Sequence, residues 1–131
     1  MADSASTRAL RGLLYLGGAV ATGAGADTAI RGARSLPGKP GSNPAIESEL
    51  RYYGAFYAAF GIHALRLAAR AERDPAGVRA VAAVVFAGGV ARARGWLREG
   101  APNAGQIALL AIELSAPPVV AALQARAGRA S

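Results

Sequence analysis

The sequence predicts an all-α protein, a four-helix transmembrane bundle. Four blocks have few or no charged residues, segments rich in proline and glycine separate them, and arginines flank them. The chain of 131 residues fits one domain, so we expect a single membrane domain over residues 1–131. The predicted helices cover about residues 9–27, 43–70, 77–95 and 104–126.

The composition excludes several classes of protein. Hydrophobic residues make up 53% of the chain and cysteine is absent, which excludes disulfide-stapled modules and thiolate metal sites. The net charge of +7 suggests a nucleic-acid partner, but all cations except Lys39 are arginines that are scattered singly and mostly flank apolar blocks. This distribution is typical of membrane anchoring, so we expect membrane lipid and no nucleic acid as the partner.

The first block, Gly12–Ala26, has fifteen uncharged residues and follows Arg8 and Arg11. The same features imitate a secretory signal that is cleaved before Asp27. We prefer a retained helix, because cleavage would leave a three-helix remnant. Small residues also recur at the spacing of close helix contacts, here and in the second block: Gly17, Ala21, Gly25, Gly54 and Ala58.

The longest predicted connection is Thr28–Ser42. It contains Pro37 and Pro40 with two glycines, so we expect a loop that cannot be helical. Asn43 followed by Pro44 is typical of a helix start, with an N-cap residue and a proline at the first helical position. The second helix therefore begins there.

The second and third blocks, Tyr52–Leu65 and Ala80–Ala91, are shorter than the about 20 residues of a spanning helix. Arginines at their ends extend each span, because a long side chain can carry its charge to the membrane surface. Neither block has the polar face that a helix of a soluble bundle requires. Asp74-Pro75 predicts a stop and a restart between them.

The fourth block, Gly105–Ala125, is interrupted only by Glu113. A charged carboxylate there costs about 3 kcal/mol unless it is paired, protonated or in a wet cavity. Arg92 ends the third block, and the two residues lie about ten positions on either side of a turn between antiparallel helices. We expect them to meet, either as a structural ion pair or as the polar centre of an apolar pocket.

The flanking charges give the predicted topology. With four spans, the side of both termini carries eight cations and the other side seven. If Arg51 and Arg92 belong to a site, the second count falls to five, which favours cytoplasmic termini in a multi-pass protein of the cell inner membrane.

The second helix offers further candidate residues. Glu49, Phe56 and His63 are seven apart and share one stripe, which is either aromatic packing or the wall of a site. In the second interpretation Arg51 and Tyr53 join them, so that Arg51, Tyr53, His63 and Arg92 bind a ligand. Glu49 and Glu113 are then the candidate acid and base. A lone histidine predicts no metal site, and no nucleotide, zinc-protease or serine-hydrolase motif predicts a cofactor.

Three segments, Glu47–Leu65, Val84–Asn103 and Leu109–Leu123, resemble the small membrane-protein family catalogued as domain of unknown function 4345. The similarity covers about residues 13–123. Its pattern has a glutamate, an arginine and an aromatic-Gly step in the second helix, an arginine ending a Gly-rich third helix, and a glutamate before a proline in the fourth. These are Glu49, Arg51, Tyr53, Gly54, Arg92, Glu113 and Pro117. The resemblance implies a four-helix integral membrane protein and no assigned activity.

Three functions follow as hypotheses. The first is a membrane protein that binds a lipophilic small molecule or a membrane partner, with the Glu/Arg cluster as its polar centre. The second is a membrane-embedded acid/base catalyst, such as an isomerase, an epoxide-opening enzyme or a cyclase. The third is a scaffolding subunit, in a homo-oligomer or with another membrane protein.

Overall fold

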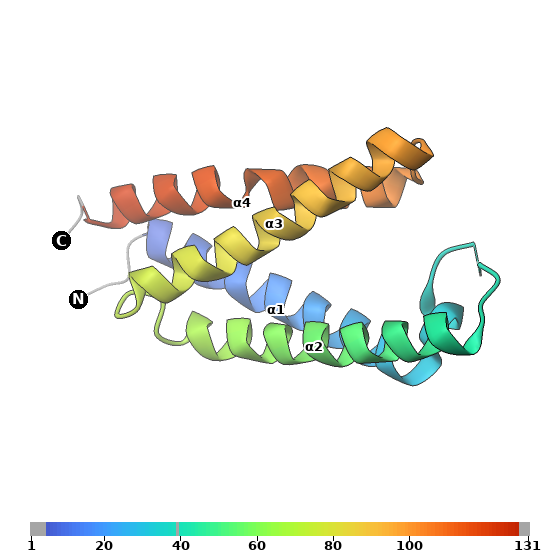
Figure 1. Cartoon of the computed structure of the whole chain (residues 1–131). Helices are drawn as coiled ribbons and strands as arrows, with labels where there is room; N and C mark the ends of the chain where they lie inside the picture. The colour runs from blue at the N-terminus through green and yellow to red at the C-terminus, as the bar shows by residue number, and fades with distance from the viewer. Residues whose placement is uncertain (1–4, 39, 129–131) are drawn as a thin grey trace. The chain divides into compact units, whose positions relative to one another are not determined.

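The computed structural model describes residues 5–38 and 40–128, and this part of the chain is helical throughout except for short connections (Figure 1). It contains no strand, so the all-α prediction is confirmed. The elements in chain order are α1 (Ala5–Arg31), the 3-10 helix η1 (Gly32–Ser35), α2 (Pro44–Ala68), α3 (Pro75–Glu99) and α4 (Ala104–Gly128).

The chain divides into two compact units. One unit contains residues 11–70, and therefore most of α1, η1 and α2. The other contains α3 and α4 with the first residues of α1. Each unit contains one antiparallel pair of helices, and the polar residues of interest lie within these two pairs.

Capping side chains start three of the helices where the sequence predicts breaks. Asn43 Oδ1 accepts hydrogen bonds from the backbone N–H groups of Ala45 and Ile46, both at 3.0 Å. Asp74 Oδ1 accepts one from Gly77 N at 2.8 Å. Asn103 Oδ1 likewise accepts one from Gln106 N at 3.0 Å. These caps satisfy N–H groups that have no partner within a helix, so they fix the helix starts.

The prediction that residues 28–42 cannot be helical is wrong for residues 28–35. α1 continues to Arg31, and η1 follows it from Gly32 to Ser35. The break at Gly32 uses a left-handed backbone with φ +57°, which glycine adopts without strain. The first proline of this segment is Pro37, so nothing before it prevents helical hydrogen bonding.

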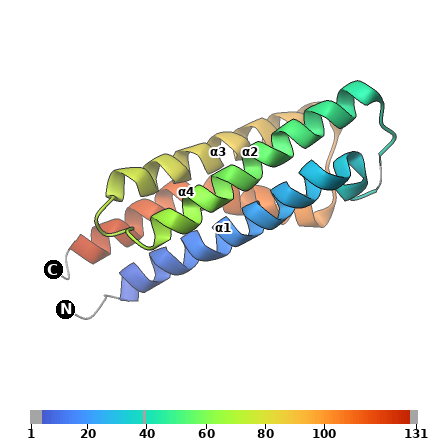
Figure 2. The same ribbon diagram turned by 90° about the horizontal axis from the view of Figure 1, so that it is seen from below.

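Glycines bring α1 and α2 into backbone contact (Figures 1 and 2). A Cβ atom on Gly18 would lie 2.9 Å from the Gly61 carbonyl oxygen, and one on Gly61 would lie 2.7 Å from that of Gly18. Gly25 and Gly54 show the same reciprocal relationship at 2.7 and 2.8 Å. Both pairs are seven residues apart on each helix, so one stripe of each helix forms the contact.

The packing position in α1 is Gly18 and not the predicted Gly17, which has no atom near its Cβ direction. A shift of one residue turns the side chain by about 100° around a helix. Gly25 and Gly54 are confirmed as contact residues, and Ala58 lies against Gly25.

In the second pair, polar contacts join the start of α3 to the end of α4. Gln124 Nε2 donates a hydrogen bond to the carbonyl oxygen of Pro75 at 3.0 Å, and Arg79 Nη1 donates one to Gln124 Oε1 at 3.2 Å. The last turns of α3 and the first of α4 are joined by a turn that ends α3 at Gly100. This register places Arg92 of α3 beside Glu113 of α4.

Candidate functional site: the Arg92–Glu113 ion pair

Arg92 and Glu113 form a bidentate ion pair. Arg92 Nε donates to Glu113 Oε2 at 2.9 Å, and Arg92 Nη2 donates to Glu113 Oε1 at 3.1 Å. The planar guanidinium matches the geometry of a carboxylate in this arrangement, which makes it one of the stronger hydrogen-bonded pairs that proteins form. The expectation that these two residues meet is confirmed.

The two partners differ in exposure. The side chain of Glu113 is 11% exposed, whereas that of Arg92 is 34% exposed. Glu113 lies nine residues after the start of α4, about 14 Å along the helix axis. Arg92 therefore presents one side to the surroundings, while Glu113 depends on Arg92 for the compensation of its charge.

Gly89 allows α3 to approach α4 at Glu113. A Cβ atom on Gly89 would lie 2.9 Å from Glu113 Cβ and 3.2 Å from a terminal carbon of Leu114. Arg92 is one helical turn further along α3, so Gly89 accommodates the stem of Glu113 and Arg92 binds its carboxylate. Both parts of the site come from one face of α3.

Two prolines lie inside α4, one turn after Glu113. Pro117 and Pro118 have no N–H group, so the carbonyls of Glu113 and Leu114 lose the donors that an ordinary helix supplies. α4 nevertheless continues through both residues. The polar centre on α4 thus consists of a carboxylate and, nearby, two backbone carbonyls outside the regular hydrogen-bond pattern.

An open hollow of about 280 Å³ adjoins Arg92 at the turn between α3 and α4. Its lining mixes one aromatic ring, small residues and few polar groups: Arg92, Gly95, Trp96, Glu99, Gly100, Pro102 and Gln106. All of these residues belong to the unit that contains α3 and α4. The arrangement places a paired guanidinium beside a largely apolar surface that is open to the surroundings.

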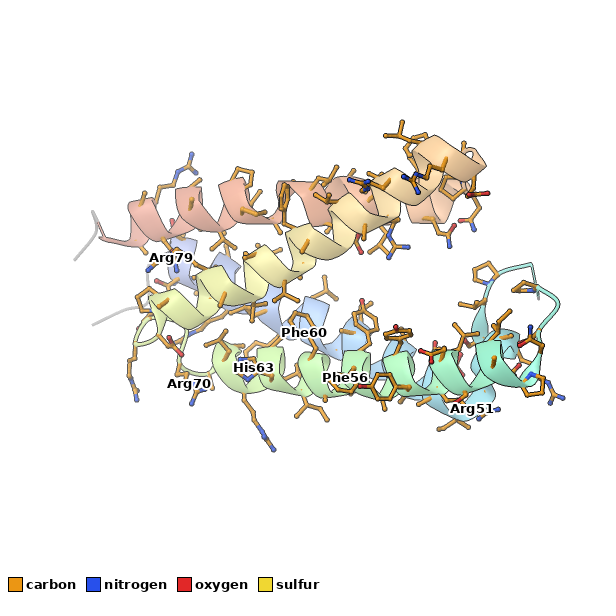
Figure 3. All side chains as sticks on the ribbon, viewed as in Figure 1. Arg51, Phe56, Phe60, His63, Arg70 and Arg79 are labelled. Atoms are coloured by element: carbon orange, nitrogen blue, oxygen red, sulfur yellow. The ribbon has the colours of Figure 1, made fainter. Side chains whose placement is uncertain are left out.

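Arg51 lies near the N-terminal end of α2, as Figure 3 shows, and binds the end of α1. Its Nη1 donates to the carbonyl oxygens of Ala29, at 3.2 Å, and of Ile30. Its Nη2 lies 3.6 Å from Glu47 Oε2, and Glu47 in turn covers Gly32. Arg51 thus caps α1, because a cation is favourable at a helix C-terminus and the last carbonyls lack partners there.

The other predicted residues of α2 are exposed. Glu49 and Tyr53 are exposed. His63 and Phe56, which share the predicted stripe, are exposed as well (Figure 3). Tyr52 contacts both Tyr53 and Phe56, with ring centroids 5.6 and 4.8 Å apart. Within their own unit these side chains form an exposed aromatic surface and do not surround a cavity. Among the described residues no group of three or more His, Cys, Asp or Glu side chains is arranged to hold a metal ion.

A protein-family model described as "Domain of unknown function (DUF4345)" matches residues 9–124. The chain belongs to this family. The family resemblance of the sequence is therefore confirmed over nearly the whole chain, and the DUF4345 description assigns no activity to it. No curated protein and no solved structure matches the chain.

In this DUF4345 chain, three features of the Arg92–Glu113 site and of the Arg51 contact are not predicted from the sequence. Glu47, not Glu49, pairs with Arg51, and the spacing of four between Glu47 and Arg51 was the available signal. Gly89 could not be identified as the contact residue, because α3 contains several other glycines and alanines. Trp96 could not be assigned to the site from the sequence, because only the turn between α3 and α4 brings it to the hollow beside Arg92.

Proposed function

We propose that this chain is an integral membrane protein that binds a lipophilic small molecule at the Arg92 hollow. The observation that carries the proposal is the bidentate pair of Arg92 with Glu113. Arg92 borders an open hollow at the turn between α3 and α4, and both helices are long enough to span a membrane. A pair of this kind compensates a charge that hydrocarbon would otherwise penalise by about 3 kcal/mol.

The membrane assignment rests on α3 and α4. Both are long and apolar enough to cross a bilayer, over Pro75–Glu99 and Ala104–Ala127. Only 6% of the most apolar stretch of α4 is buried within the chain, whereas the core helix of a soluble protein is mostly buried. The exposed side chains of Ile112 and Val119 then face lipid.

We extend the proposal to four spans. α1 has 27 residues and α2 has 25, enough to cross the about 30 Å of hydrocarbon at about 1.5 Å per residue. The glycine contacts between them suit lipid, where packing and not hydrophobicity drives helix association. Four spans place both termini on the same side of the membrane, and the flanking arginines favour the cytoplasmic side of the cell inner membrane.

Binding is favoured over acid/base catalysis by the hydrogen bonds of Glu113. Both carboxylate oxygens accept from Arg92, and this stabilises the ionised form. A general acid or base must exchange a proton in the reaction, which this pairing opposes. A scaffolding role, alone or with a second copy, predicts the same ion pair but no bound ligand. The experiment below distinguishes this role from ligand binding.

The test fills the hollow without disturbing the helices. Gly95 lines the hollow and has open space at its Cβ position, so Gly95→Leu places a side chain there. Gly88→Leu is the matched control, because Gly88 also lies in α3 with open space around it but does not line the hollow. Each protein is purified in mild detergent, and the lipophilic compounds that remain bound are identified by mass spectrometry.

We expect the unaltered chain and Gly88→Leu to retain a compound that Gly95→Leu loses. The same set of compounds in all three proteins would contradict binding at this hollow. The membrane assignment has its own test, the extraction of cell membranes with alkaline carbonate. The chain should stay in the membrane pellet, and release into the aqueous fraction would contradict four spans.

A further inference from the structure

The positive charge that borders the Arg92 hollow is already compensated. Arg92 is paired through two hydrogen bonds with Glu113, and Glu99 contributes the one other formal charge of the lining. The remaining lining residues are uncharged: Gly95, Trp96, Gly100, Pro102 and Gln106. An anion would therefore leave water without meeting an uncompensated positive charge, and a cation would meet only the carboxylate of Glu99, which is exposed and solvated. In either case the loss of water costs several kcal/mol.

Hydrogen bonds satisfy part of both helix ends beside the hollow. α3 ends here with its negative dipole end, and α4 begins here with its positive end. The first turn of α4 is capped, because Asn103 accepts hydrogen bonds from Gln106 N and Ile107 N. Gly100 N donates to the Trp96 carbonyl oxygen at the end of α3. These hydrogen bonds reduce the partial charge that each helix end offers to an anion or a cation.

Among the described residues, the unpartnered hydrogen-bonding side chains of the lining are those of Trp96 and Gln106, apart from the exposed carboxylate of Glu99. The indole of Trp96 can only donate, and the amide of Gln106 can donate or accept. The side chains of Trp96 and Gln106 form no hydrogen bond with other residues of the part that the structure describes. A ligand that accepts a hydrogen bond therefore finds more partners here than one that only donates.

From this arrangement we infer that the hollow binds an electrically neutral lipophilic molecule whose polar end is a hydrogen-bond acceptor, such as a ketone or quinone carbonyl. This inference rests on the proposed function, which supplies the site but not the ligand class. The flat ring of Trp96 and the apolar surface around it suit the hydrocarbon part of such a molecule.

Trp96 provides the readout, because it is the single tryptophan of the chain and it lines the hollow. The detergent-solubilised protein is titrated with four probes that share a ten-carbon chain: 2-decanone, decane, decanoate and decyltrimethylammonium. Trp96 fluorescence is recorded for the unaltered chain, for Gly95→Leu and for the control Gly88→Leu. Comparison with Gly95→Leu separates binding at the hollow from partition of the probe into detergent.

We expect 2-decanone to give a saturable change with an apparent Kd at least about tenfold below that of the other three probes. The change should persist in Gly88→Leu and disappear in Gly95→Leu. If decane, decanoate or decyltrimethylammonium binds as well or better, and Gly95→Leu abolishes that binding, the inferred ligand class is wrong while the site stands. If no probe gives a saturable change that depends on Gly95, the inference and the proposed function both fail.

Discussion

Gly89 of α3 lies directly against the Cβ of Glu113 in α4, one turn before the arginine that binds the Glu113 carboxylate. The absence of a side chain at this position lets the two helices approach where the polar centre lies. The close approach of α3 to α4 at Gly89 and the Arg92–Glu113 ion pair therefore occur at the same place, and each can be tested separately.

Gly89→Ala should destabilise the α3–α4 pair by about 1–3 kcal/mol, because its Cβ would overlap the stem of Glu113. The matched control is Gly88→Ala, where nothing lies near the added carbon. That substitution should stabilise the helix by up to about 1 kcal/mol, since alanine is the better helix former. Thermal unfolding in detergent measures both, and equal effects of the two substitutions would contradict the contact.

Arg92→Met should cost more stability than Glu113→Leu. The first substitution leaves a carboxylate that is 11% exposed without its partner, and the second leaves a guanidinium that is 34% exposed and can reach a polar surface. Loss of the partner of a buried charge costs about 3 kcal/mol. Denaturant unfolding of both variants checks the order, and a larger loss for Glu113→Leu would show that the burial asymmetry does not govern the pair.

Gly25→Ala should weaken the α1–α2 pair by about 1–3 kcal/mol, because the added carbon would overlap the backbone of α2. Gly23→Ala, two residues away, adds a carbon in open space and should stabilise α1 slightly. The measurement is the midpoint of thermal unfolding in the same detergent. A gain in stability at both positions would rule out the glycine contact.

Arg51→Ala should expose the end of α1, because the carbonyls of Ala29 and Ile30 lose their donor. The expected cost is about 0.5–1 kcal/mol, since Arg51 is partly exposed and solvent competes for these bonds. Hydrogen exchange of a peptide covering residues 24–36 should become faster, and Arg51→Lys should restore part of the protection through its charge. Arg66→Ala on the same helix is the control, and equal acceleration in the control would contradict a specific cap.

The sequence predicted the parts of this fold that depend on local chemistry and on hairpin symmetry. Asn43-Pro44 and Asp74-Pro75 mark helix starts wherever they occur, because their capping is a property of neighbouring residues. Arg92 and Glu113 could be paired because two antiparallel helices joined by a short turn oppose residues equally distant from that turn.

Features that depend on helix rotation could not be predicted. Gly17 and Gly18 are adjacent in a segment rich in small residues, and only the position of α2 distinguishes the contact residue from its neighbour. Glu47 and Glu49 pose the same problem, since both lie in the first turns of α2 and only one faces Gly32. The helix beyond Thr28 is not predicted, because the loop prediction extends the effect of Pro37, Pro40 and the two glycines beside them to residues 28–35, which precede them.

The central claim is that Arg92 and Glu113 serve a ligand site and are not needed to hold the helices together. The double variant Arg92→Met/Glu113→Leu removes both charges and replaces them with apolar side chains of similar size, a change that is often neutral or stabilising for a buried pair. Its thermal unfolding and its titration with 2-decanone, followed by Trp96 fluorescence, decide the matter. We predict a midpoint of unfolding close to that of the unaltered chain and a loss of saturable binding. A double variant that binds 2-decanone with an unchanged Kd would contradict the claim.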